Sequence, residues 1–388
     1  MEVLYHKPFV PRRIESIFPD SIKNGWLTTG PVVKKFESKL CDYLNSDNVI
    51  AVNSCTAALH LALASKNISS KDSFIAPTYT FVSTVEIGLY FKSRPILVDS
   101  DINTFLLDLN KVEDTLKKDK NNDIKFIIPV HFAGQSCDMK NLNFLAEKHG
   151  VFIVEDGAHA LETESNIGKI GDNNHICCFS FYANKNITTG GEGGAISTND
   201  NLLANKLRKL SLHGMSKDGW NRFSKGGKWA YDISDLGYKY NMTDYAAAFG
   251  IDQLDRIEKW HQKRLAIADQ YKLGLKNIEG IILPQHYQGE KHSWHLYIIR
   301  IVPEIWSIDR NDIILKLNAR GVGTSVHYIP VHHHSYFKKK YGFKENDFPN
   351  SNKLSGTVIS LPIYPGLEIN EVKYVIDTIK NLWEENKI

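Results

Sequence analysis

The sequence predicts an α/β protein with a mostly parallel sheet covered by helices on both faces, followed by a smaller α+β unit. Short apolar segments alternate with helical segments through the first two thirds of the 388-residue chain, and this alternation is typical of βαβ units. The pattern then changes to helices with few strands between them. The composition, with 42% hydrophobic and 23% charged residues, is ordinary for a globular protein.

The larger part contains seven predicted strands, at residues 49–52, 73–76, 95–98, 126–130, 151–155, 177–181 and 194–197. Helices are predicted between them at residues 56–63, 83–90, 109–116, 139–148 and 202–212. Ligands of such sheets bind outside the carboxyl ends of the strands. Asp156 and Lys185 both follow strands, so we expect both to reach one crevice.

The rest of the chain completes two predicted domains. Residues 217–228, rich in Gly, Ser, Lys and Trp, are expected to form a loop before a helix at 242–260. Beyond it we predict a helix at 262–275, a strand at 295–302, a helix near 310–320 and a terminal helix at 370–386. We therefore expect a large domain at 1–255, which includes the N-terminal segment, and a small C-terminal domain at 256–388.

Charge and cysteine usage narrow the class of protein. A formal net charge of +3 is too balanced to indicate nucleic-acid binding. No apolar run approaches the roughly 18 residues of a membrane span, and the first residues lack the apolar core of a secretory signal. The five cysteines are odd in number and scattered, which predicts reduced thiols in a cytoplasmic protein.

The most informative pair of residues is Lys185 with Asp156. Lys185 follows an apolar strand and precedes a glycine-rich turn, and Asp156 closes an earlier strand. Enzymes that use pyridoxal phosphate (PLP) need a lysine amine that attaches to the cofactor aldehyde and a carboxylate that keeps the pyridine nitrogen protonated. Taken singly, such a lysine is usually solvated and such an aspartate is usually a cap or turn residue. Their order in an α/β chain favours the cofactor site.

Four further segments contain candidate ligands for the cofactor. Residues 53–59 form a strand-to-helix turn whose free N–H groups suit a phosphate, although Ser54 or Thr56 there can equally be a plain N-cap. Phe81 can stack on a flat ring or belong to the core. His159 can stack on the ring or bond to it, or be a satisfied core histidine. The Ser180 hydroxyl can bind phosphate or be neutral filler.

The histidine-rich segment 327–334 invites a metal site, but a substrate-facing loop or surface histidines are favoured. Zinc sites usually add a carboxylate or thiolate at a defined spacing, and no such partner is evident. Lys338, Lys339 and Lys340 are expected on a solvated helix face. The chain lacks the G-x-x-x-x-G-K-[ST] loop, which argues against a nucleoside triphosphatase.

Together these segments resemble the DegT/DnrJ/EryC1/StrS family of PLP-dependent sugar aminotransferases nearly from end to end. The resemblance is strongest at residues 155–160 and 179–194, and it includes residues 25–31, 53–59, 77–84, 237–244, 323–327 and 360–367. It implies the aspartate aminotransferase fold, known as fold type I, and a homodimer. One branch of the family replaces the lysine with histidine and dehydrates sugars, and the presence of Lys185 argues against that branch.

The resemblance also implies roles for individual residues. PLP is expected on Lys185 with Asp156 at the pyridine nitrogen, Phe81 stacked on the ring, and His159 at a position that the family fills with His or Gln. The phosphate contacts fall on Cys55, Thr56 and Ser180, and the substrate contacts are expected at Thr29, His327 and Tyr328. Family members lend an Asn to the neighbouring subunit's phosphate from a Gly-Tyr-Asn-Tyr-Arg segment. Here that segment reads Gly-Tyr-Lys-Tyr-Asn, so Lys239 is the strict match and Asn241 the available amide.

The resulting hypothesis is a transaminase that moves an amino group from glutamate or glutamine to a nucleotide-linked keto-sugar, with pyridoxamine phosphate as the intermediate form of the cofactor. A 4-keto-6-deoxy sugar used for surface polysaccharide is the expected acceptor, and amination at C-3 is the alternative. Two other classes of function remain as alternatives. One is a non-catalytic sugar-binding regulator on the same fold, and the other is a metal-dependent hydrolase that uses the histidines at 327–334. The intact Lys185 and Asp156 argue against the regulator.

Overall fold

A seven-stranded sheet forms the centre of the larger part of the molecule. In the computed structural model, which describes residues 1–173, 175–215 and 232–388, the strand order is β1 (Asn48–Val52), β9 (Gly194–Thr198), β8 (Ile176–Ser180), β5 (Phe152–Asp156), β4 (Ile124–Ile127), β2 (Ser73–Pro77) and β3 (Arg94–Val98). β9 runs antiparallel to β1 and β8, and the other neighbouring pairs of this sheet are parallel. The predicted mostly parallel sheet is therefore confirmed.

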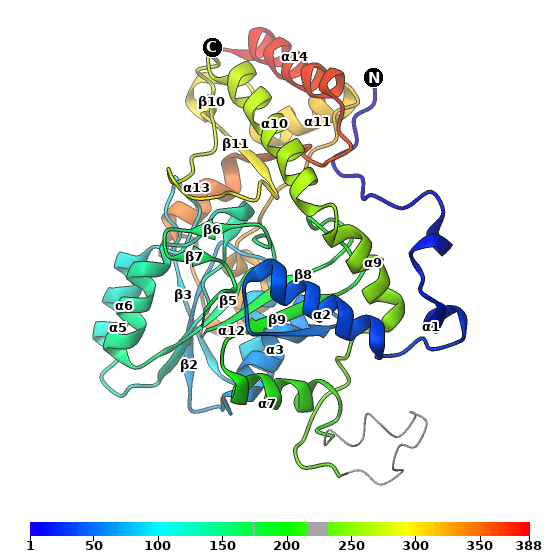
Figure 1. Ribbon diagram of the computed structural model, residues 1–388. Helices are drawn as coiled ribbons and strands as arrows, with labels where there is room; N and C mark the ends of the chain where they lie inside the picture. The colour runs from blue at the N-terminus through cyan, green and yellow to red at the C-terminus, as the bar shows by residue number, and fades with distance from the viewer. Residues whose placement is uncertain (174, 216–231) are drawn as a thin grey trace.

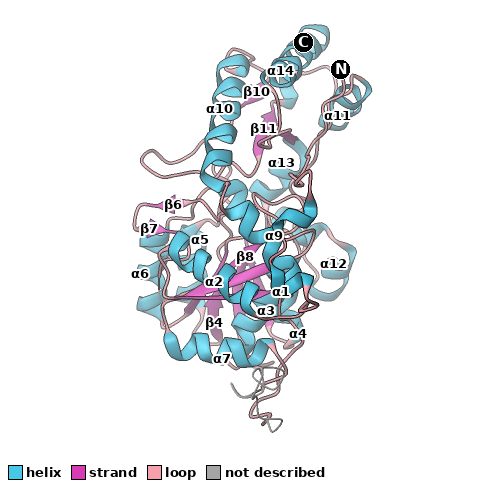
Figure 2. Cartoon of the chain, turned by 45° about the vertical axis from the view of Figure 1, so that its right-hand side comes forward, coloured by secondary structure: helices cyan, strands magenta, loops and turns pink. Residues whose placement is uncertain are grey.

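Helices cover both faces of this sheet because successive strand residues alternate between two cores. Ile75, Ile127 and Ile153 face one core, with α2 (Pro31–Leu44), α5 (Leu109–Lys118), α6 (Met139–His149) and α9 (Asp244–Leu254). Phe74, Phe126 and Val154 face the other core, with α3 (Cys55–Ser65), α4 (Ser83–Tyr90) and α7 (Asn201–Ser211). Figures 1 and 2 show the strands between these two sets of helices. The side chains of a pleated strand alternate in this way, so both faces must be apolar.

A second, smaller sheet belongs to a separate core. The strands β10 (Ile281–Ile282), β11 (Tyr297–Ile301) and β12 (Val358–Leu361) are antiparallel and pack with α10 (Ile257–Leu275), α11 (Arg310–Ala319) and α14 (Ile369–Asn386). These elements gather at the end of the molecule opposite α7 (Figures 1 and 2). Val3 of the N-terminal segment joins this core and pairs with Val322.

The division at residue 255 stays a prediction. Two helices from the C-terminal part, α12 (Ser335–Tyr341) and α13 (Pro349–Thr357), pack against the cores of the large sheet through Phe337 and Leu354. The remaining short elements are α1 (Asp20–Lys23), β6 (Glu164–Ser165), β7 (Gly168–Lys169) and 3-10 turns at Ile14–Ile17, Phe132–Gly134, Pro303–Ile305, Val331–His333 and Glu345–Asp347.

The predicted elements agree with the structure in number and order across the large sheet, and two differences concern helices. The predicted helices at 242–260 and 262–275 are wrong in their boundary, because the helix is interrupted at Asp255–Arg256: α9 ends at Leu254, and α10 runs without interruption from Ile257. The helix α2 was not predicted. The predicted loop at 217–228 lies outside the described residues. Within the described ranges, no helix is long and apolar enough to span a bilayer.

Candidate active site

A cavity of about 480 Å³ lies at the carboxyl ends of the parallel strands. Turns after β1, β2, β5 and β8 contribute to it, together with a segment before α12. This is where open α/β sheets bind ligands, because the connecting loops meet there. Nine of the predicted site residues line this one cavity: Cys55, Thr56, Phe81, Asp156, His159, Ser180, Lys185, His327 and Tyr328.

Lys185 lies in the turn between β8 and β9. Its backbone N–H donates to the carbonyl of Tyr182 at 2.9 Å, and the chain turns back through Gly190 and Gly191. Those two glycines have φ values of +89° and +124°, which side chains with a Cβ rarely adopt. Burial lowers the pKa of Lys185 to about 8, and Asp156 and Cys55 oppose that shift. More of the amine is therefore neutral near physiological pH than in an ordinary lysine, and the charged form still predominates there.

Asp156 is a buried carboxylate at the end of β5 that two donors hold in place. The Thr84 hydroxyl donates to Oδ2 at 2.7 Å, and the Ala158 N–H donates to Oδ1 at 3.1 Å. Burial raises the pKa of Asp156, and these two hydrogen bonds and Lys185 act against it. Thr84 was not singled out in the sequence, because it lies in a run of threonines with no local feature that marks one of them.

An aromatic group lines the other side of the cavity. Phe81 is 57% exposed, so the alternative of a core residue is wrong. Its ring centroid lies 6.0 Å from that of Tyr328. Tyr328 in turn bonds the Nε2 of His159 through its hydroxyl at 3.1 Å. Flat, partly exposed rings at a strand end suit a planar heterocycle.

The histidines of the site are neutral. The Ala133 N–H donates to Nδ1 of His159 at 3.2 Å, so the proton of the neutral ring lies on Nε2 and is donated to Tyr328. Burial, with Lys185 and His327 nearby, holds the pKa of His159 well below its usual value. Burial also lowers the pKa of His327 to about 4, and its Nδ1 lies 2.8 Å from the Ser360 hydroxyl.

The start of α3 also lines the cavity, and a helix N-terminus of this kind suits an anion. The Ser54 side chain accepts from the Ala57 N–H at 3.0 Å and caps the helix, while the N–H groups of Cys55 and Thr56, as first-turn groups, have no acceptor within the helix. Gly194 of β9 passes so close that a Cβ there would lie 2.5 Å from the Ser54 carbonyl carbon. The backbone of β9 therefore packs directly against the first turn of α3, with no room for a side chain at Gly194.

These residues fit pyridoxal phosphate. The cavity combines a lysine amine, a buried carboxylate, exposed aromatic rings and a helix N-terminus with the adjacent Ser180 hydroxyl. The cavity is also lined by Asn184, whose Oδ1 is buried and has no hydrogen-bond partner in the described part of the chain. A buried polar atom without a hydrogen-bond partner costs free energy, and a bound group that donates to this Oδ1 would remove that cost.

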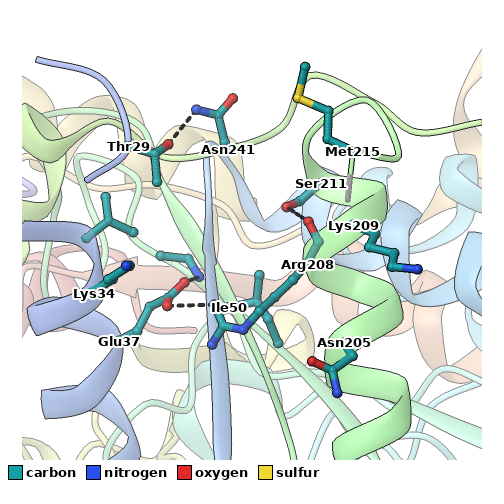
Figure 3. Close-up of a pocket in the computed structure, with 12 residues that line it drawn as sticks. Thr29, Lys34, Glu37, Ile50, Asn205, Arg208, Lys209, Ser211, Met215 and Asn241 are labelled. Atoms are coloured by element: carbon teal, nitrogen blue, oxygen red, sulfur yellow. Dashed lines mark hydrogen bonds and ion pairs between the residues drawn. The ribbon is translucent and has the colours of Figure 1, made fainter. Parts of the chain in front are cut away.

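Thr29 and Asn241 do not join this cavity. They line a second cavity of about 450 Å³, beside Arg208 and Glu37 (Figure 3). The Asn241 amide donates to the Thr29 hydroxyl at 2.6 Å, and the Lys239 amine donates to the Asn241 Oδ1 at 2.5 Å. Within one chain these residues are therefore separate from Lys185, and their expected roles in a neighbouring subunit stay predictions.

The histidine-rich segment makes ordinary hydrogen bonds. His332 bonds the Thr78 hydroxyl at 2.7 Å and the Asn352 side chain at 2.9 Å, and His333 also bonds Asn352. Among residues that the structure describes, no group of three or more potential metal ligands comes together. Of this segment, His327 and Tyr328 line the cavity with Lys185.

Comparisons with known proteins agree with this geometry. A profile of the DegT/DnrJ/EryC1/StrS aminotransferase family matches residues 12–380. The spore coat polysaccharide biosynthesis protein SpsC of Bacillus subtilis is 40% identical over 382 residues, which cover 97% of this chain and 96% of SpsC. Spr1654 from Streptococcus pneumoniae, assigned as a sugar aminotransferase and solved in its PMP form, superposes with a TM-score of 0.91 at 31% identity over 99% of this chain and 100% of its own. Helicobacter pylori PseC, an aminotransferase involved in the biosynthesis of pseudoaminic acid, superposes with a TM-score of 0.89 at 25% identity over 99% of this chain and 100% of its own.

Proposed function

This chain belongs to the DegT/DnrJ/EryC1/StrS aminotransferase family and is a pyridoxal-phosphate-dependent transaminase, and we propose that it aminates a nucleotide-linked keto-sugar. The observation that carries the proposal is the meeting of Lys185 with Asp156 in one cavity at the carboxyl ends of the strands. The family profile covers both residues.

The residues of the cavity divide the work of transamination. Pyridoxal phosphate, when bound, supplies an aldehyde that takes the amino group and a ring that accepts electrons from the carbon that loses its proton. Lys185 holds the cofactor at rest, and its freed Nζ then carries the proton as a general base. A pKa of about 8 keeps this amine active near neutral pH. Asp156 would accept a hydrogen bond from the protonated pyridine nitrogen and keep that nitrogen charged, and Thr84 keeps the carboxylate in place.

The other lining residues orient the reactants. Phe81 and His159 present rings that hold a planar group, and the neutral His159 fixes the Tyr328 hydroxyl through its Nε2–H. Tyr328 therefore has its own hydroxyl proton free to donate to a substrate oxygen. Cys55, Thr56 and Ser180 bind the cofactor phosphate at the start of α3. Such positioning supplies much of the rate acceleration in reactions of this kind.

The active site is completed by a second copy of the chain. Thr29 and Asn241 lie side by side (Figure 3), and neither lines the cavity that holds Lys185 in its own chain. In an isologous dimer each such pair faces the corresponding site of the other subunit. We assign the contact with the neighbouring cofactor phosphate to Asn241, and Lys239 supports its amide through the bond to Oδ1. Thr29 contacts the substrate from the same edge.

The acceptor is a 4-keto-6-deoxy sugar on a nucleotide, and the donor is glutamate or glutamine. Support comes from SpsC, named for spore coat polysaccharide biosynthesis, and from structural neighbours named as sugar aminotransferases. The five cysteines are free thiols, which supports a cytoplasmic enzyme that prepares amino sugars for surface polysaccharide.

A panel of nucleotide-linked keto-sugars tests the proposal. Purified protein is incubated with UDP-, dTDP- and GDP-linked 3-keto and 4-keto sugars and with either donor, and the mass and aminated carbon of each product are determined. We expect amination at C-4 of one nucleotide sugar. Amination at C-3 would show that the proposed carbon is wrong and that the alternative position is aminated. Transamination of simple keto acids with no conversion of any nucleotide sugar would overturn the assignment of substrate class.

A further inference from the structure

A buried ion pair lies behind the cavity, between Glu162 and Arg264. Glu162 follows the turn after β5 and Arg264 lies on α10, and they are 0% and 1% exposed. The guanidinium Nη2 donates directly to Oε1 of the carboxylate. Removing two charges from water is costly, so a buried pair is weak support for a purely stabilising role. Its further contacts show what else it does.

Glu162 also holds the residue that follows Lys185. Its second oxygen, Oε2, accepts from the Asn186 amide nitrogen at 2.7 Å. The Asn186 amide oxygen lies 2.9 Å from Nδ1 of His295, so the amide has a donor on one side and an acceptor on the other. Glu162 therefore accepts from two donors, with one carboxylate oxygen for Asn186 and the other for Arg264. A carboxylate provides two acceptor oxygens, whereas an amide provides one.

Arg264 also reaches the His159 side of the cavity. Its Nε donates to the backbone carbonyl of Ser293 at 3.1 Å, and the Ser293 hydroxyl donates to the carbonyl of His159 at 2.6 Å. One planar guanidinium thus fixes two segments, through Glu162 and through Ser293. Arginine suits this task because its rigid fork directs several donors at once.

We propose that Glu162 and Arg264 are positioning residues for transamination, which hold Lys185 through Asn186 and His159 through Ser293. Neither residue lines the cavity, and both act through a neighbour. The inference rests on the role of Lys185 given above. A lysine that must first capture the cofactor and then carry a proton needs its backbone fixed, since a shift of about 1 Å can reduce a rate about 100-fold.

The test compares Glu162→Gln, Asn186→Ala and the double variant. Glutamine keeps the shape of Glu162 but offers one acceptor oxygen to two donors, so either Asn186 or Arg264 loses its bond to residue 162, while both keep their contact with the Ser293 carbonyl. The first readout is the rate at which cofactor-free protein forms its covalent link with pyridoxal phosphate, followed by visible absorbance. The second is the division of the kinetic effect between kcat and KM. We expect each single variant to lower the capture rate and kcat by about 10- to 100-fold, with KM changed by less than about 3-fold.

The double variant distinguishes positioning from general weakening. Residues that act through one bond have non-additive effects, so the double variant should be no slower than the slower single variant. Asp99→Asn is the matched control, because Asp99 is also a buried carboxylate after a strand, and it bonds Ser351 away from the cavity. It should lower Tm and leave the capture rate unchanged.

Several outcomes would overturn the inference. One is a Glu162→Gln protein with reduced Tm and wild-type capture rate and kcat; another is additive losses in the double variant. Should Glu162→Gln fail to fold, wild-type rates in Asn186→Ala decide against the proposal and reduced rates support it. Lys185→Ala is measured in parallel: if it still forms the covalent link, the assignment of Lys185 itself is wrong, which is a different failure.

Discussion

Replacing Asp156 by asparagine keeps the size of the side chain and removes its charge. The Ala158 N–H can only donate, so the new amide oxygen must face it, and the amide nitrogen then faces Thr84. The Thr84 hydroxyl can rotate to accept, with the Thr80 hydroxyl 2.9 Å away as its other partner. We therefore expect Asp156→Asn to fold and to bind pyridoxal phosphate.

The rate should fall much more than the affinity for the cofactor. Asp156 is buried, and breaking a buried charge pair costs about 3–5 kcal/mol. At about 1.4 kcal/mol for each factor of ten, the half-reaction with the amino donor should slow by ~140- to ~3700-fold. Thr84→Val removes one of the two hydrogen bonds to the carboxylate and leaves its charge. Thr84→Val should raise the activation free energy by about 1 kcal/mol, which slows the same half-reaction about 5-fold.

Stopped-flow single-turnover measurements, with cofactor absorbance as the signal and cofactor content determined separately, give these rates. Asp99→Asn again serves as the control, because it neutralises a buried carboxylate that does not line the cavity and accepts from Asn350 and Ser351. Our reasoning would be refuted by an Asp156→Asn protein that is fully loaded and within about 3-fold of the wild-type rate. An equal loss in Asp99→Asn would also refute it, because the effect would then not depend on the site.

The remaining predictions concern Lys185 and the shared site. Lys185→Ala should lose both the borohydride-reducible link to the cofactor and turnover; wild-type turnover would exclude Lys185 as the catalytic residue. Because the pKa of Lys185 is lowered to about 8, its neutral fraction rises as pH increases through that value, so the capture rate of pyridoxal phosphate should rise up to about pH 8 and then level off. A rate that keeps rising towards pH 10.5 would show an unshifted lysine. Mixing the inactive Lys185→Ala protein with a protein inactivated at Asn241 should restore some activity, because one site of the mixed dimer carries neither defect. If the subunits exchange and no activity appears, either Asn241 does not act in trans or the sites are not shared.

Local sequence features were sufficient for the sheet and for the central pair of the site. A strand buried on both faces must be apolar along its whole length, so the seven strands of the large sheet can be recognised from short segments. Lys185 and Asp156 stand at the ends of such strands, and parallel strands bring their carboxyl ends to one edge. The helix boundary near Asp255 could not be found in this way, because the side chains on both sides of it have a similar helical pattern.

The supporting contacts were decided only by the tertiary structure. The Thr84 bond to Asp156 joins residues 72 positions apart, and the Tyr328 bond to His159 joins residues 169 apart. The same holds for the contact between Glu162 and Arg264 and for that between Thr29 and Asn241. No local pattern indicated that Thr29 and Asn241 lie outside the cavity of Lys185. A hydrogen bond between distant segments depends on how the helices pack on the sheet. That packing cannot be predicted from the residues that flank the donor or the acceptor in the sequence.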